Sequence, residues 1–286
     1  MKILICGASG FVGRHLTQAL KEAGHTVLRG VRHPLDQGDI AVDYCKDTGK
    51  EIWLPRLTGI EIVVNAVGVL RDSPKNPMQK LHNETPSALF EACVETGVER
   101  IVHLSALGIE SGINVPYFTT RRAAESTLQG LPSKVRWLCL RPSVIYGEDG
   151  ESSKMFRQMA KLPVLALPMG GKQGLQPVHI DDICAAVTLW LYDSNATTQT
   201  VDAVGAEATT MRGMLDSYRQ QMHYRSALHL AIPSWVMGLV AKAGDYIPSS
   251  PMCSDTLQML SASNTAEVAG FSKLLKRSPK GYRTFI

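Results

Sequence analysis

The first dozen residues constrain the fold of this chain more than any other segment. They read Lys2-Ile3-Leu4-Ile5-Cys6-Gly7-Ala8-Ser9-Gly10-Phe11-Val12-Gly13, an apolar run that stops at a glycine, followed by two more glycines at intervals of three. An amphipathic stretch follows Gly13. The pattern predicts a strand, a tight turn and a helix start, which is the geometry that places dinucleotide phosphates on a helix N-terminus. The alternative is a turn whose glycines serve only close packing. We favour phosphate binding, with Gly7, Ser9, Gly10, Phe11, Val12 and Gly13 as cofactor contacts.

The remainder of the first half alternates between strand and helix patterns. Apolar residues recur at helical spacing from Val12 to Ala23 and stop before Gly24. This alternation predicts an α/β fold with a doubly wound parallel sheet, Rossmann-like in type. The segment 36–57 is less regular and stays unassigned. The expected strands are 26–31, 59–67, 100–104 and 135–140, and the expected helices include 86–96 and 118–128.

After Arg141-Pro142 the composition changes, because glycine and proline become frequent. We expect residues 1–142, with returns from about 176–205, to form the dinucleotide-binding domain. Residues 143–175 and 206–286 form a small discontinuous C-terminal lobe. A helix is predicted over 182–192 and a strand over 200–204. The basic segment 272–286 is weakly patterned, and we expect it to be loosely ordered.

An apolar patch after Pro233 has two interpretations. Trp235, Val236, Leu239 and Val240 lie at the spacing of an amphipathic helix. Such a helix can pack on a protein core or lie in a membrane surface. We favour packing.

Composition and motifs exclude several classes of protein. A net charge of +4 without a basic run argues against nucleic acid as a partner. The six cysteines are scattered without paired spacing, as in a reducing compartment. No window is apolar enough to span a membrane, and the chain enters a strand at once, so we expect a cytoplasmic location. His179 and Asp181 lack a third ligand at useful spacing, so we expect no metal, and interpret Asp181 as a helix N-cap.

The residues after the second predicted strand favour one cofactor. In proteins that bind NAD(H), an Asp or Glu after this strand binds the ribose 2′-hydroxyl, and residues 26–34 contain neither. Arg29, Arg32 and His33 occur there instead. Arginine can bind a 2′-phosphate through paired, charge-assisted hydrogen bonds. The sequence therefore favours NADP(H) over NAD(H), with Arg32 as the contact; a solvated surface charge is the alternative.

Several motifs occur in one order along residues 1 to about 215. They are the glycine turn, Asn65-Ala66-Val67-Gly68, His103-Leu104-Ser105-Ala106, Tyr117-x-x-x-Arg121, Arg141-Pro142-Ser143-Val144-Ile145-Tyr146-Gly147 and Pro177-Val178-His179-Ile180-Asp181-Asp182. The set resembles the extended and atypical short-chain dehydrogenase/reductase superfamily. Within it, the likeness is closest to the NAD(P)-binding group that includes the dehydrogenase-like accessory subunit of respiratory complex I.

The resemblance implies roles for particular residues. Tyr117 and Arg121 occupy the positions of the catalytic Tyr-x-x-x-Lys pair, with arginine in place of lysine. Ser105 matches the catalytic hydroxyl, although Ala106 replaces a second serine. Since arginine is planar and cannot relay a proton, the exchange is not conservative. The implied cofactor contacts are Asp43, Ala66, Val67, Gly68, Tyr117, Arg121 and Pro142.

The leading functional expectation is an NADP(H)-binding oxidoreductase that transfers hydride between nicotinamide and a small carbonyl or hydroxyl substrate. One alternative is a redox sensor, or an accessory or assembly protein of a respiratory complex, that binds NADP(H) without turnover. For that alternative, the resemblance implies that the protein associates peripherally with a larger complex. A weaker alternative is a sugar-nucleotide epimerase or dehydratase. No motif identifies the substrate or the oligomeric state.

Overall fold

The computed structural model describes residues 1–247, 250, 252–262 and 264–286. Contacts divide the chain into two compact units. Unit 1 comprises Met1–Ile109, Pro116–Arg141 and Ile183–Val201, and unit 2 comprises Glu110–Val115, Pro142–Asp182 and Asp202–Ile286. Compared with the ranges expected from the sequence, unit 1 keeps only 183–201 of the returning segment and lacks 110–115. As folding domains, the expected ranges stay a prediction.

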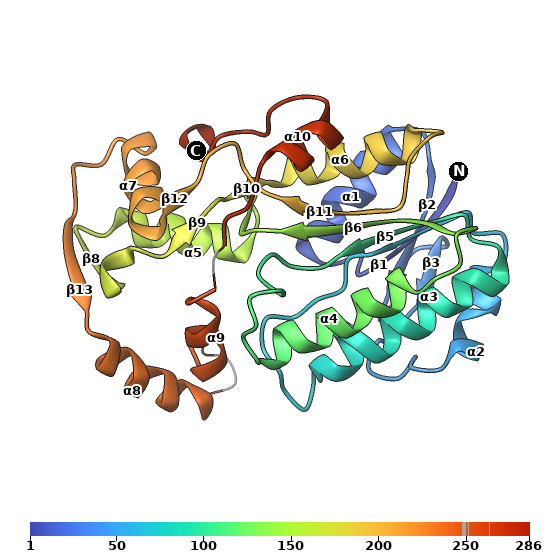
Figure 1. Ribbon diagram of the computed structural model, residues 1–286, viewed down its shortest axis with the longest axis horizontal. Helices are drawn as coiled ribbons and strands as arrows, with labels where there is room; N and C mark the ends of the chain where they lie inside the picture. The colour runs from blue at the N-terminus through green and yellow to red at the C-terminus, as the bar shows by residue number, and fades with distance from the viewer. Residues whose placement is uncertain (248–249, 251, 263) are drawn as a thin grey trace. The chain divides into compact units, whose positions relative to one another are not determined.

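Unit 1 is built on a seven-stranded sheet with the order β11-β6-β5-β4-β1-β2-β3. The β3–β2, β2–β1, β1–β4, β4–β5 and β5–β6 pairs are all parallel. Helices α3 and α4 cover one face of the sheet, and α1 and α6 cover the other (Figure 1). The predicted doubly wound, Rossmann-like α/β fold is confirmed. The chain leaves β1 toward β2 on one side and returns to β4 on the other. The crevice at this switch point is where such sheets bind ligands.

The strands of unit 1 form where the sequence is continuously apolar. Ile3, Val63 and Val102, on β1, β4 and β5, are fully buried, as expected for strands covered on both faces. Helix α3 has a proline in its first turn and ends at Gly97, whose φ of 77° suits a glycine C-cap. These signals explain why the central elements lie close to their predicted ranges.

The unassigned segment 36–57 contains only short elements, β3, α2 and η1. In chain order, the helices and strands are β1 (Lys2–Cys6), α1 (Phe11–Glu22), β2 (Thr26–Val31), β3 (Asp39–Ala41), α2 (Lys50–Trp53), η1 (Pro55–Leu57), β4 (Ile62–Asn65), η2 (Gln79–Glu84), α3 (Thr85–Thr96), β5 (Arg100–Leu104), α4 (Pro116–Gln129), β6 (Arg136–Pro142), β7 (Ile145–Tyr146), α5 (Glu151–Lys161), β8 (Val164–Pro168), η3 (Met169–Gly171), β9 (Gly174–Leu175), β10 (Val178–His179), α6 (Ile180–Tyr192), β11 (Gln199–Ala203), β12 (Thr209–Thr210), α7 (Met211–Gln221), β13 (Leu228–Ile232), α8 (Ser234–Asp245), α9 (Ser254–Met259), α10 (Ala269–Leu275) and η4 (Tyr282–Thr284).

Unit 2 contains three two-stranded sheets, β7–β10, β8–β13 and β9–β12. Its core includes Tyr146, Leu167 and Tyr218, and the chain end contributes Tyr282 and Phe285. The expectation of a loosely ordered segment 272–286 is therefore wrong, because two of its aromatic side chains are buried. Within the described part of the chain, no helix is both long and apolar enough to cross a membrane.

Candidate functional site

The glycine turn after β1 is closely packed at each of its three glycines. Gly7 has a φ of 81°, and a Cβ there would lie 3.0 Å from the backbone of Ala66 at the end of β4. A Cβ on Gly13 would lie only 2.1 Å from the carbonyl oxygen of Gly7. The turn therefore needs glycine both for its backbone conformation and for the contact between α1 and β1.

The start of α1 fits a diphosphate. Gly10 is the N-cap residue, so no side-chain oxygen caps the first turn of this 12-residue helix. No acidic side chain lies in that turn either. Amide N–H groups and the positive end of the helix dipole favour an anion at such a terminus. The residues present thus suit the phosphates of a dinucleotide.

The two arginines of the cationic cluster after β2, Arg29 and Arg32, have different roles. Arg29 donates to both carboxylate oxygens of Asp39, each at 2.7 Å, and also to Asp36 at 2.5 Å. Its guanidinium is thus committed to holding the β2–β3 connection. Arg32 is exposed, and it forms no ion pair with any residue that the structure describes. Of the two arginines, Arg32 is the one available to a ligand.

Asp43, the expected adenine contact, lies in a turn after β3. Its carboxylate accepts the backbone N–H of Cys45 at 3.0 Å and lies 3.3 Å from the Lys46 ammonium. Partial burial raises the pKa of Asp43, but these contacts and the charge of Arg32 outweigh burial, so its pKa lies below the usual value. A contact between Asp43 and adenine stays a prediction.

Tyr117 and Arg121 lie one turn apart near the start of α4. The guanidinium carbon of Arg121 is 4.7 Å from the centroid of the Tyr117 ring. Arg121 is buried and donates to the carbonyl oxygen of Leu104 at 3.0 Å. The predicted pairing of these side chains on one helical face is present, but the charge lies over the ring face. Arg122 donates to the Ile109 carbonyl oxygen instead, at 3.1 Å from its Nε.

Gly68 has a role that the sequence did not reveal. A Cβ at this position would lie 2.4 Å from a terminal nitrogen of Arg121. Glycine leaves room for the guanidinium where it lies, and any side chain here would displace the end of Arg121, whatever the value of Gly68 for cofactor approach. The neighbouring Ala66 and Val67 contact Gly7 of the glycine turn. One continuous set of contacts thus joins the glycine turn to Arg121 and Tyr117.

Two buried polar atoms around Arg121 have no hydrogen-bond partner among the described residues, His103 Nε2 and Arg121 Nε, and the buried Ser105 hydroxyl beside them faces only the Glu125 carboxylate, whose pKa it helps to lower. His103 lies in β5, and Ser105 directly follows the last residue of that strand, Leu104, whose carbonyl oxygen accepts from Arg121. Buried polar groups are normally paired, so such a cluster is unusual outside a functional site.

The buried side chains of Tyr44 and Asn65 position His103 and the backbone of Val67. The Asn65 amide oxygen accepts from the Tyr44 hydroxyl at 2.9 Å and from the Val67 N–H at 3.2 Å. Its amide nitrogen then faces His103 Nδ1 at 3.1 Å and donates to it. The imidazole proton of His103 must therefore sit on Nε2. The sequence placed Asn65 and His103 in motifs but assigned them no role.

His82 is a site residue that sequence reasoning missed. It lies in the π-helical turn η2, and its Nε2 accepts the Val69 N–H at 3.0 Å. Its proton is therefore on Nδ1, which faces Thr120 Oγ1 at 3.3 Å. The ring meets Tyr117 edge to face at 5.7 Å. No spacing in the sequence singles out His82.

Burial, followed by the charge of Arg121, lowers the pKa of His82 to about 2 and that of His103 to about 4. Both histidines are therefore neutral in the folded protein at mildly acidic pH.

In the unfolded chain, where histidine pKa values lie near 6.5, the same two side chains take up protons at higher pH than in the folded protein. The free energy of unfolding is thus expected to fall as the pH drops below about 6.5, by about 1.4 kcal/mol per pH unit for each histidine, until each folded pKa is reached. Urea titrations between neutral and mildly acidic pH measure this slope. In His82→Gln the part of the slope that is due to these two histidines should fall by half; equal stability at every pH would contradict the burial of neutral histidines.

Glu125 and Arg141 form a buried ion pair beside the same strands. Arg141 Nε lies 3.1 Å from both carboxylate oxygens, and a terminal nitrogen lies 2.5 Å from one of them. Burial raises the pKa of Glu125, but the hydrogen bonds from Arg141 outweigh it and leave the pKa below its usual value. The pair fixes the end of β6 at Pro142, whose predicted contact with the cofactor stays a prediction.

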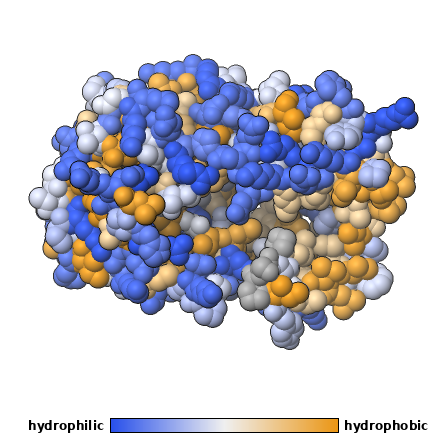
Figure 2. All heavy atoms as spheres, turned by 180° about the vertical axis from the view of Figure 1, so that it is seen from behind, coloured by the Kyte–Doolittle hydropathy of each residue, from blue (hydrophilic) through white to orange (hydrophobic). Residues whose placement is uncertain are grey.

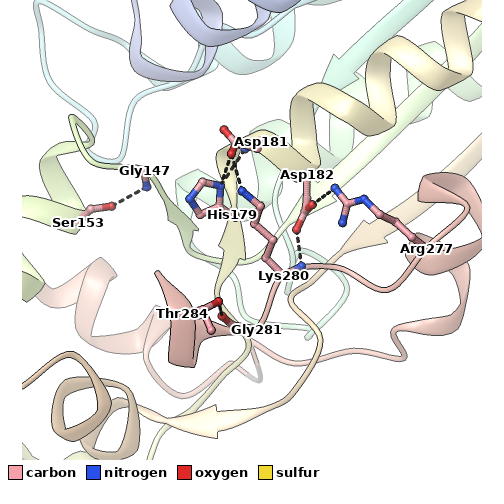
Figure 3. Close-up of polar contacts among 9 residues, drawn as sticks. All are labelled: Gly147, Ser153, His179, Asp181, Asp182, Arg277, Lys280, Gly281 and Thr284. Carbon is pink, nitrogen blue, oxygen red and sulfur yellow. Dashed lines mark hydrogen bonds and ion pairs between the residues drawn. The ribbon is translucent and has the colours of Figure 1, made fainter. Parts of the chain in front are cut away.

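In unit 2, the acidic residues at the start of α6 bind the chain end (Figure 3). The buried Asp182 carboxylate accepts from the Arg277 guanidinium at 2.5 Å and from the backbone N–H of Lys280 at 2.7 Å. Asp181 pairs with the Lys280 ammonium at 2.6 Å and lies 3.3 Å from His179 Nδ1. These contacts explain why the segment after α10 is ordered.

The interpretation of Asp181 as a helix N-cap is wrong, because α6 already begins at Ile180 and Asp181 lies in its first turn. No group of His, Cys, Asp and Glu within the described ranges could hold a metal ion. The acidic residues act as anchors for a basic segment far along the chain.

Comparison with known proteins agrees with the fold. A family model described as "NAD dependent epimerase/dehydratase family" matches residues 3–202. The chain is 23% identical over 250 residues to the mitochondrial NADH-ubiquinone oxidoreductase 40 kDa subunit of Neurospora crassa, covering 83% of this chain and 64% of that protein. It is 28% identical over 190 residues to a ceramide reductase of Caulobacter vibrioides, covering 64% and 58%. The chain thus spans less than two thirds of the length of either relative.

Among solved structures, one similar fold is a UDP-glucuronic acid 4-epimerase from Bacillus cereus in complex with UDP-glucuronic acid and NAD. The TM-score is 0.71 at 19% identity, covering 100% of this chain and 96% of that one. At this identity the likeness establishes the architecture alone.

Proposed function

Because the chain belongs to the NAD dependent epimerase/dehydratase family, we propose that it is an NADP(H)-dependent oxidoreductase acting on a small carbonyl or hydroxyl compound. The observation that carries this proposal is the set of contacts from the glycine turn to Tyr117. Gly7 packs against Ala66 and Val67, Gly68 packs against Arg121, and Arg121 lies over Tyr117. These contacts support the proposal because they join the glycine turn, as the cofactor site, to Tyr117, as the proton donor, within unit 1.

In this proposal the glycine turn and the start of α1 hold the cofactor diphosphate, and Arg32 binds the 2′-phosphate. The bound nicotinamide supplies the hydride. Tyr117 donates a proton from its hydroxyl to the substrate oxygen during reduction, and takes it back during oxidation. The Arg121 guanidinium lies over the ring and holds it in place for this exchange. Ser105 offers the substrate oxygen a second hydrogen bond.

The second candidate is a protein that binds NADP(H) without turnover, as a redox sensor or an accessory protein of a larger complex. One observation favours it. Arg121 is held by the Leu104 carbonyl and packed against Gly68, so its guanidinium cannot act as a mobile proton relay. The similarity to a respiratory-complex subunit is in line with such a role. A cytoplasmic location also stays a prediction.

Substitutions at the catalytic pair separate the two candidates. For an oxidoreductase, Tyr117→Phe should lower turnover of NADPH-dependent carbonyl reduction by about 100-fold or more, because a general acid is lost. Its NADPH dissociation constant should change little. Arg121→Lys should raise turnover by restoring the family's pair. Steady-state kinetics across a panel of aldehydes and ketones, with NADPH titrations, measure both effects. Tight NADPH binding together with no turnover in wild type and Arg121→Lys would reject the enzyme in favour of the second candidate.

The cofactor preference has its own test. Arg32→Ala should weaken NADPH binding by about 10- to 100-fold, since charge-assisted hydrogen bonds to the 2′-phosphate contribute about 1.5–3 kcal/mol. NADH binding should hardly change. Fluorescence titration of both cofactors measures this, with Lys21→Ala at the far end of α1 as a charge-matched control. If both cofactors lose affinity equally, Arg32 is not the 2′-phosphate contact.

A further inference from the structure

Unit 2 exposes one face of the β8–β13 ribbon although that face is apolar. The strands pair in parallel, with Leu228 opposite Val164 and Leu230 opposite Ala166. Val164, Leu228 and Leu230 are 41%, 61% and 50% exposed, whereas the alternate residue Leu165 is 1% exposed. One side of the ribbon therefore packs on the core, and the other presents aliphatic side chains to the surroundings.

Helix α8, which follows β13 after Pro233, extends this apolar surface. Trp235 and Leu239, one turn apart, are 69% and 60% exposed, while Met237 and Ala241 form the packed face of the helix. The expectation that the patch around Trp235 packs on the core is therefore wrong for its two largest side chains. Figure 2 shows apolar side chains gathered at the right of its view, the side of α8 and β13. We call the exposed residues of β8, β13 and α8 the apolar face of unit 2.

The segments that build and flank this face carry an excess of positive charge. Residues 151–181 and 216–245 contain seven Lys and Arg residues and four acidic ones, of which Asp216 pairs with His229 of β13 at 2.9 Å and Asp245 ends α8. Lys161 and Arg225 are exposed, and each lies three residues before the paired Val164 and Leu228, so both lie at the same end of the ribbon. Lys242 is exposed on α8. The apolar face thus lies among cations.

We propose that the apolar face of unit 2 binds the surface of a membrane rich in anionic lipid. Aromatic and aliphatic side chains enter the boundary between headgroups and acyl chains, and neighbouring Lys and Arg residues are attracted to anionic headgroups. Trp235 suits that boundary because its indole has an apolar body and a polar N–H. A second copy of the chain fits the face less well. A two-fold interface brings the same surface of both copies together, and here it would bring together two surfaces that each carry an excess of positive charge.

Trp235 provides a direct probe of this contact. The other three tryptophans, Trp53, Trp137 and Trp190, are buried. When the full chain is mixed with phosphatidylcholine vesicles containing about 30% phosphatidylglycerol, the Trp235 emission should shift to shorter wavelength and iodide quenching should fall. The protein should float with these vesicles in a density gradient. Pure phosphatidylcholine vesicles should bind about tenfold less, and raised salt should weaken the anionic interaction.

Variants test whether the apolar face of unit 2 is the surface that binds the vesicles. Trp235→Ser combined with Leu239→Ser should lower the vesicle-bound fraction about tenfold or more. Leu35→Ser, at an exposed leucine of unit 1, should bind as wild type. Trp235→Phe should keep most binding but lose the emission shift. The proposal is overturned if the chain fails to float with anionic vesicles, or if the double variant floats equally well. It is also overturned if sedimentation shows a dimer that the double variant abolishes while vesicles leave Trp235 unchanged.

Discussion

Gly13→Ala is expected to abolish NADPH binding and to lower the free energy of unfolding by about 3 kcal/mol or more, the upper range for overpacking a core. The added Cβ would lie 2.1 Å from the oxygen and 2.7 Å from the carbonyl carbon of Gly7. Both atoms belong to the backbone, so no side-chain rotation relieves the contact. Helix α1 must move away from β1, and the turn that would hold the cofactor phosphates moves with it.

Urea denaturation and NADPH titration of the same variant measure the two effects. Gly270→Ala is the matched control, because a Cβ at this α10 position meets nothing within 4 Å. Alanine is favoured over glycine in helices, so the control should be neutral or slightly more stable. Normal stability of Gly13→Ala would mean that the close packing of α1 on β1 has been misjudged.

Asp182→Ala should lower the free energy of unfolding by about 3–5 kcal/mol, because two hydrogen bonds to a charged group are lost at a buried position. The carboxylate holds both the Arg277 side chain and the Lys280 backbone. Without it, the segment that carries Tyr282 and Phe285 into the core of unit 2 is released. The start of α6 also loses a favourable negative charge.

Limited trypsin digestion detects this release, since the chain end contains Lys276, Arg277, Lys280 and Arg283. The variant should be cut there much faster than wild type, and urea denaturation gives the loss of stability. Asp181→Asn is the control, because this neighbouring carboxylate is 56% exposed and an exposed ion pair contributes only about 0–1 kcal/mol. If both variants were equally stable, Asp182 would not be the anchor.

The sequence predicted the central fold because local patterns and tertiary structure agree there. Strands β2 and β5 occupy their expected ranges, 26–31 and 100–104. Long apolar runs and glycine helix ends are strong local signals. The segment 36–57 could not be assigned because β3 and α2 contain only three and four residues. Such short elements have no periodicity, and their neighbours hold them in place.

The candidate site was predictable where a motif lies on one element and unpredictable where it depends on distant contacts. The spacing of Tyr117 and Arg121 placed them on one face of a helix. The hydrogen bond of Arg121 to Leu104 joins residues 17 apart, and that of Asp182 to Arg277 joins residues 95 apart. No local pattern contains such pairs. His82 is a further case, because its role depends on η2 lying beside α4.

The contact between Gly68 and Arg121 makes the two positions interdependent. While arginine occupies position 121, even a methyl group at 68 collides with its terminal nitrogen. A shorter side chain at 121 would remove that collision and free position 68 to vary. A change toward the family's lysine would therefore make larger residues at 68 easier to accommodate. In a set of related chains, these two positions should accordingly change together, although 52 residues separate them.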